Sequence, residues 1–335
     1  MTLTTQADAA SLPLVTAVLI CWNHERFVRS AVLSALGQTY RNIQLIVFDN
    51  GSTDGSRREL EALRAEHEFT LICQGNVGLV PALNQALAMA RGKYLALLAT
   101  DDIWFADKTA KQVAFMQAHP DVHLVSGQVQ AIDEDGRPAG RHRLERPGEA
   151  TFADLMSMGC FVYGPTILCR TETLREMGGF DESMRIEDYS LALRLTHEGR
   201  RVFVLRDDLT YYRRHASSWT ARSIDPELGE IGARFRHTPE YPAFYRHHFP
   251  LTFWRLVRDG QKRVALRLLV CEPVPWTWRN VGRGLIRMLI PYSLVRAYRA
   301  LTGNADDADS GAREPAERCA QRRQAADGKQ GNKAT

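Results

Sequence analysis

The segment YLALLATDD, residues 94–102, joins a short apolar run directly to two adjacent carboxylates. An apolar run of this length, bounded by polar residues, predicts a buried strand of a parallel sheet. Ligands of such sheets bind at the carboxyl ends of the strands, where Asp101 and Asp102 stand. Neighbouring carboxylates repel each other unless a cation or strong donors compensate, so the pair predicts a divalent metal that holds a diphosphate. The alternative is a solvated turn that caps the next helix.

The residues before this segment repeat the same pattern of an apolar strand followed by polar side chains. Residues 14–20 and 44–48 are apolar runs that lead into Asn23 and Asp49, and residues 70–73 form another strand. Apolar residues at helical spacing predict the intervening helices. These helices cover residues 27–36, 55–67 and 79–90. The alternation predicts an α/β fold, with a mainly parallel, Rossmann-like sheet flanked by helices.

The rest of the chain is less regular and sets the expected domain boundaries. Residues 122–132 and 202–205 read as strands, 187–197 as a helix, 133–136 as a turn and 137–148 as an exposed loop. The tail is polar and low in aromatic residues, which is typical of disorder. We therefore expect a flexible N-terminus at 1–12, a catalytic domain at 13–223, a helical, basic C-terminal region at 224–303 and a disordered tail at 304–335.

Composition and charge exclude several classes of protein. The 335 residues are 44% hydrophobic and 24% charged, which is ordinary for a globular protein, and the formal net charge of +4 is too small to indicate nucleic-acid binding. The six cysteines are scattered, so neither a disulfide framework nor a zinc site is expected. The N-terminus lacks the apolar core of a signal peptide, and no apolar run is long enough to span a bilayer. We expect a cytoplasmic protein.

Three further segments carry side chains suited to chemistry, each with a simpler structural alternative. Asp49 opens the turn DNGSTDG at a strand end, where it could contact a sugar or a base, or the turn could only cap a helix. Asp188 faces inward if a helix begins at Glu187, which suits a general base, although the helix dipole alone favours an acid there. The aromatic and cationic stretch 211–219 could grip a diphosphate, or it is an exposed basic loop.

In their order and spacing, these segments resemble the family 2 glycosyltransferases, whose members have the A-type glycosyltransferase fold. The resemblance spans residues 14–220. It rests on VLICWNHERF (18–27), SALGQTY (34–40), DNGSTD (49–54), QGNVGL (74–79), ALNQAL (82–87), ARGKYLALLATDD (90–102), GGFDE (178–182), IEDY (186–189) and YRRHASS (212–218). Each segment alone is a weak signal, and their joint order is specific.

The resemblance implies a role for each matching residue. Asp188 is the catalytic base with Glu187 beside it, Asp102 ligates a divalent metal, Mn²⁺ or Mg²⁺, and His215 approaches the metal or the diphosphate. The nucleotide-sugar, a UDP- or dTDP-sugar, contacts Asn23, Glu25, Asp49, Asn76, Asn84 and Asp101. It further implies one displacement that inverts the anomeric carbon and moves the sugar to a hydroxyl group of a growing cell-surface polysaccharide or a lipid-linked glycan.

The sequence departs from the family's pattern at three positions. Many relatives carry an acid where Ala99 stands, which leaves fewer carboxylates for a metal. Trp22 replaces a more usual tyrosine before Asn23, a change that bears on base stacking. Asn50 replaces a frequent second aspartate beside Asp49. None of these differences removes the implied chemistry.

Residues 276–301 alternate aromatic and aliphatic side chains with arginines. This pattern suits an amphipathic contact with an anionic membrane at its inner face, and it would make a lipid-linked acceptor natural. It suits equally an ordinary helix pair packed on the catalytic domain with its arginines in solvent. Both interpretations stay open.

Other functions fit parts of the same pattern. A dinucleotide-dependent oxidoreductase would need a glycine-rich turn after the first strand, where the chain has CWNH at 21–24. A metal-dependent nucleotidyltransferase would also use paired acids, but it usually has a glycine-rich basic loop there. A non-catalytic sugar-nucleotide binding module would not need Asp102 and Asp188. A nucleic-acid binding role is not expected, because the basic and aromatic residues cluster outside the predicted site.

Overall fold

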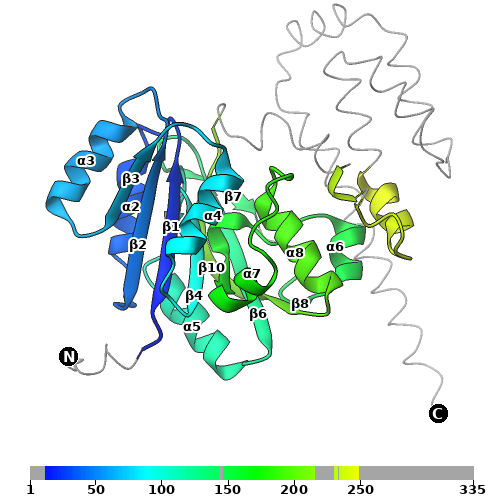
Figure 1. Ribbon diagram of the computed structural model, residues 1–335. Coiled ribbons are helices and arrows are strands. Elements are labelled where there is room, and N and C mark those ends of the chain that lie inside the picture. The colour runs from blue at the N-terminus through cyan, green and yellow to red at the C-terminus, as the bar shows by residue number, and fades with distance from the viewer. Residues whose placement is uncertain (1–11, 143–145, 216–229, 233, 249–335) are drawn as a thin grey trace, which may run out of the picture. The chain divides into compact units, whose positions relative to one another are not determined.

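The computed structural model describes residues 12–142, 146–215, 230–232 and 234–248 (Figure 1). All of them belong to one compact unit of the chain, residues 1–251. All but the last residue of the predicted flexible N-terminus, 1–12, lie outside the described residues, as do the basic segment 276–301, the tail 304–335 and the stretch 216–219. None of the helices in the described part combines the length and the apolar character needed to cross a lipid bilayer.

The N-terminal half is the predicted alternation of parallel strands and helices. Its elements are β1 (Val15–Cys21), α2 (Val28–Leu36), β2 (Ile43–Asn50), α3 (Ser56–Glu66), β3 (Thr70–Gln74), α4 (Leu79–Met89) and β4 (Tyr94–Ala99). The strands lie in the order β3-β2-β1-β4, and each neighbouring pair is parallel. The nearly continuous apolar runs of β1 and β4 are buried because helices cover both faces of the sheet. This half confirms the prediction.

The C-terminal half makes the sheet mixed. Its elements are β5 (Ile103–Trp104), α5 (Lys108–Ala118), β6 (Val122–Ile132), β7 (Pro138–His142), β8 (Gly148–Ala150), α6 (Phe152–Met158), η1 (Gly164–Thr166), β9 (Leu168–Arg170), α7 (Thr171–Glu176), α8 (Glu187–His197) and β10 (Arg201–Arg213). The short strand β9 lies between β4 and β6 and is antiparallel to both. The sheet is therefore parallel on one side of β9 and mixed on the other.

Two predictions for this half need correction. The expected exposed loop at 137–148 contains β7, which pairs with β6, and ends in β8, which pairs with β10. The strand expected at 202–205 runs from Arg201 to Arg213, so Tyr211 and Tyr212 belong to a strand and not to a loop. Backbone pairing with β6, the neighbouring long strand, overrides the polar character of both segments.

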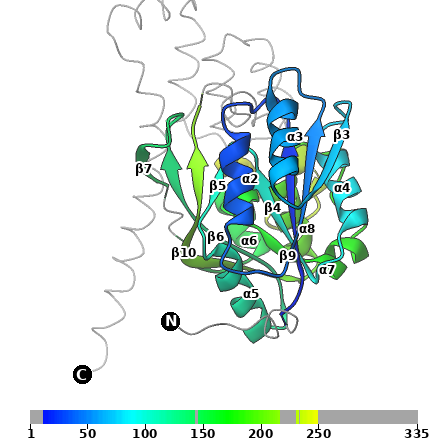
Figure 2. The same ribbon diagram turned by 90° about the vertical axis from the view of Figure 1, so that its left-hand side faces the viewer.

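The sheet separates two hydrophobic cores. One core lies under α2, α3 and α5 and includes Val28, Leu60 and Met116, and the other lies under α4 and α8 and includes Leu83 and Leu195. Figure 2 shows α4 and α7 on the opposite side of the sheet from α2. Residues 230–248 add Ile231, Phe235 and Phe244 to the second core. The polar ends of β1, β2 and β4 stay at one edge of the sheet, where the candidate site lies.

Candidate active site

The loop after β1 is tied to the loop after β2 by side chains that were predicted to bind a nucleotide-sugar. Asn23 has a left-handed backbone (φ 58°), which asparagine tolerates better than most residues. Its Oδ1 accepts a 2.7 Å hydrogen bond from Thr53 N–H, and its own N–H donates to Ser52 Oγ at 3.0 Å. Glu25 Oε2 accepts from Gly55 N–H at 3.1 Å, at the start of α3. Both side chains therefore join the loop after β1 to the loop after β2.

Asp49 ends β2 between two neighbouring strands. It is paired in register with Cys21 of β1 and Cys73 of β3, and it is only 2% exposed. One carboxylate oxygen accepts a 3.2 Å hydrogen bond from Ser52 N–H, so the turn that follows the strand folds back over it. The position at the carboxyl edge of the parallel strands is the one expected from the sequence.

Asn50 organises the loop between β3 and α4. Its Nδ2 donates to Gly78 O at 3.1 Å, and its Oδ1 accepts from Gln74 Nε2 at 3.0 Å. Asn76, another predicted nucleotide-sugar contact, lies exposed in this loop, and its Oδ1 accepts from Gly78 N–H at 2.9 Å. An aspartate at position 50 would lack the donor that Gly78 O requires. The asparagine therefore has a structural reason in this chain.

Asp101 and Asp102 point in different directions after β4. Asp101 Oδ2 lies 3.0 Å from His215 Nε2, which comes from the end of β10. Asp102 is 1% exposed, and its Oδ1 accepts a 2.8 Å hydrogen bond from the backbone N–H of Arg213. The sequence assigned the metal to Asp102 and a sugar contact to Asp101. The structure instead turns Asp102 into the protein and pairs Asp101 with His215.

The two carboxyls also differ in their electrostatics. Burial, and next the negative charge of Asp101, raises the pKa of Asp102 well above its usual value. Burial also opposes the ionisation of Asp101, but other interactions, the hydrogen bond with His215 foremost, outweigh it and lower the pKa of Asp101. Asp101 is therefore the member of the pair that carries the negative charge towards the histidines.

His24 completes a group around Asp101 that the sequence did not single out. One ligand atom each from His24, Asp101 and His215 lies within 4.8 Å of the others. The rings of His24 and His215 meet edge to face, with centroids 6.1 Å apart. Burial lowers the pKa of His24, which favours its neutral form. Carboxylate oxygen and neutral imidazole nitrogen are both suitable ligands for a divalent transition metal.

Arg213 fastens this group to the rest of the sheet. Its guanidinium donates to the carbonyl oxygens of Asp101 at 2.8 Å, of Asp133 at 3.1 Å and of Glu134 at 3.0 Å. The same guanidinium lies 4.8 Å from the centre of the Phe27 ring. Arg213 thus fixes the backbone at Asp101 from a strand that lies far along the chain, which fixes the direction of the Asp101 side chain.

Asp188 lies in the first turn of α8, and backbone groups hold both of its carboxylate oxygens. Oδ2 accepts from Gly164 N–H at 2.9 Å, and Oδ1 accepts from Tyr189 N–H at 2.7 Å. A Cβ at position 164 would lie 3.0 Å from Glu187 Oε1 and 3.6 Å from Asp188 Oδ2, so Gly164 lets both carboxyls lie over the backbone. Burial raises the pKa of Asp188. A carboxyl with a raised pKa, held in place at a helix start, suits proton transfer.

Buried hydrogen bonds hold the turn η1, which contains Gly164, against the strand ends. Pro165 O accepts from Trp104 Nε1 at 2.8 Å and from Thr210 Oγ1 at 3.1 Å. Gln112 Nε2 donates to Thr166 O at 2.7 Å. Trp104 lies just after Asp102, and Thr210 just before Arg213. The segment that carries the Asp188 contact is therefore fixed to two of the three segments that carry His24, Asp101 and His215, namely the one after β4 and the end of β10.

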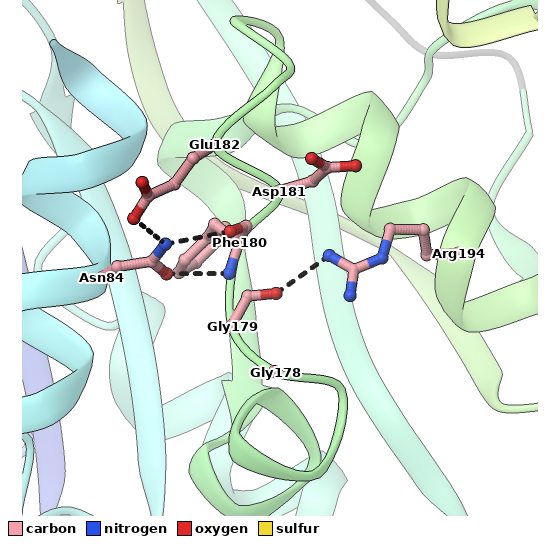
Figure 3. A pocket seen from close by; sticks show the side chains of 7 residues that line it. All are labelled: Asn84, Gly178, Gly179, Phe180, Asp181, Glu182 and Arg194. Atoms are coloured by element: carbon pink, nitrogen blue, oxygen red, sulfur yellow. Dashed lines mark hydrogen bonds between the residues drawn. The ribbon is translucent and has the colours of Figure 1, made fainter. Parts of the chain in front are cut away.

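Asn84 was predicted to contact the nucleotide-sugar, but its amide joins α4 to the 178–182 turn. Nδ2 donates to Phe180 O and to Glu182 Oε1, both at 2.9 Å, and Oδ1 accepts from Phe180 N–H at 2.8 Å (Figure 3). From the other side, Arg194 donates to Gly179 O at 2.9 Å. These residues line a cavity of about 390 Å³ together with Gly178 and Asp181. The asparagine positions the turn through these bonds.

The sequence reasoning gave no site role of their own to His24, Thr100 and Gly164, and it included Arg213 only as part of the stretch 211–219. His24 directly follows Asn23 at a strand end, and Thr100 precedes the acid pair, so their positions were an available signal. Nothing in the local sequence marked Gly164, because its importance comes from the N–H that it offers to Asp188.

The chain is similar to known proteins over most of the described domain. The sequence profile of the family described as "Glycosyl transferase family 2" matches residues 16–178. EpsE of Bacillus subtilis (strain 168), named as a glycosyltransferase, is 31% identical over 221 residues, which cover 63% of this chain and 77% of that protein. The Escherichia coli UDP-Glc:alpha-D-GlcNAc-diphosphoundecaprenol beta-1,3-glucosyltransferase WfaP is 29% identical over 216 residues, covering 64% and 82%. The match to an uncharacterized Rickettsia prowazekii (strain Madrid E) glycosyltransferase, 30% identical, spans 57% of that relative's length.

Solved structures share the fold at lower sequence identity. S. aureus TarS 1–349, in complex with UDP-GlcNAc, aligns with a TM-score of 0.64 and 17% identity over 86% of this chain and 92% of that one. The mannosyltransferase PcManGT from Pyrobaculum calidifontis, in complex with GDP-Man and Mn²⁺, aligns with a TM-score of 0.57 and 18% identity over 88% and 89%. These likenesses show that the described domain has the A-type glycosyltransferase fold.

Proposed function

The chain belongs to glycosyl transferase family 2, and on that premise we propose that it transfers a sugar from a nucleoside-diphosphate sugar to an acceptor hydroxyl with inversion at the anomeric carbon. The observation that carries the proposal is the arrangement of Asp101 facing His215 at 3.0 Å, with Asp188 held by η1. A charged carboxylate, an imidazole and a separate carboxyl with a raised pKa suit a metal-assisted displacement with a general base.

Asp101 and His215 are the residues that would hold a divalent cation, Mn²⁺ or Mg²⁺. Their facing atoms are 3.0 Å apart, which matches the spacing of about 3.0 Å between adjacent ligands about 2.1 Å from an octahedral ion. The side chain of Asp101 is 15% exposed and that of His215 is 2% exposed, so the surrounding protein atoms hold both side chains in place. When bound, the cation supplies positive charge that stabilises the departing diphosphate.

Asp188 would remove the proton from the acceptor hydroxyl as that oxygen attacks the anomeric carbon. Its two backbone hydrogen bonds, from Gly164 and Tyr189, fix the carboxylate against rotation. Such orientation matters, because a general base must lie within hydrogen-bonding distance of the proton that it takes. Asn23, Asp49 and Asn76 would line the side of the site that receives the nucleotide.

The acceptor class is proposed from the relatives. WfaP is named for transfer from UDP-Glc to a sugar on diphosphoundecaprenol, a lipid-linked acceptor, and TarS was solved with UDP-GlcNAc. We infer that this chain uses a UDP- or dTDP-sugar to extend a lipid-linked glycan or a cell-surface polysaccharide. The basic, amphipathic sequence at 276–301 would place it at the inner face of a membrane.

A ligand screen tests the donor directly. The protein is heated with Mn²⁺ and one of UDP-, dTDP- or GDP-sugars, and unfolding is followed by fluorescence. A ligand that binds the folded state raises the melting temperature, and we expect a rise with UDP- or dTDP-sugars that requires Mn²⁺. If none of these donors raises the melting temperature at any Mn²⁺ concentration, the proposed function is wrong.

Glu187 gives a prediction about pH. Burial, and next the charge of Asp188, raises the pKa of Glu187 to about 8. A carboxyl with a raised pKa favours the folded state only while it is protonated, so its contribution to stability falls as pH rises from about 4.5 towards 8. We expect Glu187→Gln to leave the melting temperature unchanged at pH 4.5 and to raise it by roughly 5 °C at pH 8.5.

Glu172→Gln provides the control for that measurement, because Glu172 is an exposed acid in the first turn of α7. Its melting temperature should follow that of the wild type at every pH. A parallel pH dependence of Glu187→Gln and the wild type would show that Glu187 is ionised in the folded protein.

A further inference from the structure

His24 lies where a metal held by Asp101 and His215 would bind. In the part of the chain that the structure describes, His24, Asp101 and His215 are the one group of three or more potential ligands whose ligand atoms all lie within 4.8 Å of one another. His24 reaches this group from the loop after β1, whereas the other two come from the ends of β4 and β10. Ala99, at the exposed end of β4, offers only a methyl group.

The hydrogen bonds around His24 determine which ring nitrogen is available. Thr100 Oγ1 donates to Ile20 O at 3.3 Å, so its single proton is already used. With that bond in place, the 2.7 Å contact between His24 Nδ1 and Thr100 Oγ1 is a bond donated by Nδ1–H, and this is the tautomer that we assign to His24. In that tautomer, Nε2 carries the free lone pair. Histidines that bind metals characteristically donate their other ring N–H in this way, which fixes the ring and its tautomer.

The backbone holds His24 in place as well. Its N–H donates to Ser56 Oγ at 2.9 Å, and its carbonyl oxygen accepts from Phe27 N–H and Val28 N–H, both at 2.9 Å. The imidazole is therefore fixed through the main chain and through Thr100 before any ligand arrives. A side chain with so little freedom loses little entropy when it binds an ion.

We propose that His24 is a third protein ligand of the divalent metal, through Nε2, and that it makes the centre selective for Mn²⁺ over Mg²⁺. The inference rests on the metal centre of the proposed function and adds a residue and a selectivity to it. With His24, the protein supplies two imidazole nitrogens and one carboxylate oxygen. Mg²⁺ prefers oxygen ligands, whereas imidazole binds the transition metals better, so this set disfavours Mg²⁺.

A variant separates the metal role from a merely structural one. His24→Asn keeps an N–H donor at the place of Nδ1, so the bond to Thr100 can persist, and it removes Nε2. His67→Asn is the matched control, because His67 ends α3 and pairs only loosely with Glu66, at 3.9 Å. If His24 only anchors the loop, His24→Asn and His67→Asn should bind Mn²⁺ alike.

The measured quantity is the affinity for Mn²⁺, obtained from the electron paramagnetic resonance signal of free Mn²⁺. The sample is the full chain with UDP, without a sugar donor or an acceptor. We expect His24→Asn to weaken Mn²⁺ binding by about tenfold or more and His67→Asn to leave it unchanged. A second variant, His24→Glu, replaces nitrogen by oxygen. It should lower the Mg²⁺ concentration that displaces half of the bound Mn²⁺ by about tenfold or more, relative to the wild type.

The outcomes distinguish the existence of the metal centre from the role of His24 in it. If the wild type binds Mn²⁺ and His24→Asn binds it equally, the metal centre stands and His24 is not a ligand. If the same Mg²⁺ concentration displaces half of the bound Mn²⁺ from His24→Glu and from the wild type, the proposed selectivity for Mn²⁺ is wrong. If the wild type binds no Mn²⁺ with UDP, both the metal centre and the role of His24 are overturned. Glycosyl transfer is tested separately, by the melting-temperature screen with donors.

Discussion

Asp188→Asn is expected to abolish sugar transfer while leaving donor binding intact. Asparagine preserves the size of the side chain, and its Oδ1 can still accept a hydrogen bond from Gly164 N–H, but it cannot take a proton. A positioned general base contributes about 10²–10⁴ to the rate, so kcat should fall by that factor. The donor should raise the melting temperature of the variant as much as that of the wild type.

Asp135→Asn serves as the control for this variant. Asp135 is an exposed acid in the turn after β6, and its loss should change neither kcat nor donor binding. If Asp188→Asn turns over at the wild-type rate, Asp188 is not the base. If it loses donor binding together with turnover, the residue acts in the nucleotide pocket instead.

Asp101→Asn is expected to remove both metal binding and catalysis. The carboxylate faces His215 at 3.0 Å, and an amide in its place carries no charge to hold a cation. Because a bound metal contributes several kcal/mol to the stabilisation of a departing anion, kcat/KM should fall by about 10³ or more. Mn²⁺ affinity, measured with UDP, should fall in parallel.

The neighbouring acid provides the contrast. Asp102 is buried, and its Oδ1 accepts the backbone N–H of Arg213, a bond that the Oδ1 of asparagine can also accept. Asp102→Asn should therefore leave the free energy of unfolding close to that of the wild type and should weaken Mn²⁺ binding far less than Asp101→Asn does. Urea unfolding and Mn²⁺ titration of the two variants test this division of roles. A larger loss of Mn²⁺ affinity in Asp102→Asn than in Asp101→Asn would restore the assignment made from the sequence.

The different directions in which Asp101 and Asp102 point show where sequence reasoning stops. The apolar run before them predicted the strand and the edge on which both acids lie. Which acid faces the site depends on the turn after β4, and that turn is held by Arg213, a residue more than a hundred positions later. No local pattern carries that information.

Dependence on contacts between distant parts of the chain also explains the other differences between the predicted and the observed structure. Apolar runs such as β1 and β4 were predictable, because their burial on both faces leaves a nearly continuous apolar sequence. The strands β8 and β9 are each three residues long, too short for a periodic signal, and they exist because neighbouring long strands pair with them. Asn84 was in a recognisable motif, yet its amide bonds to residues almost a hundred positions away.

The insertion of β9 between β4 and β6 bears on how the protein is made. Chains fold from the N-terminus as they are synthesised, and the strands that carry Asp49 and Asp101 come first. Asp188 and His215 leave the ribosome later. A nascent chain that has folded only through β4 therefore lacks the proposed base and a proposed metal ligand.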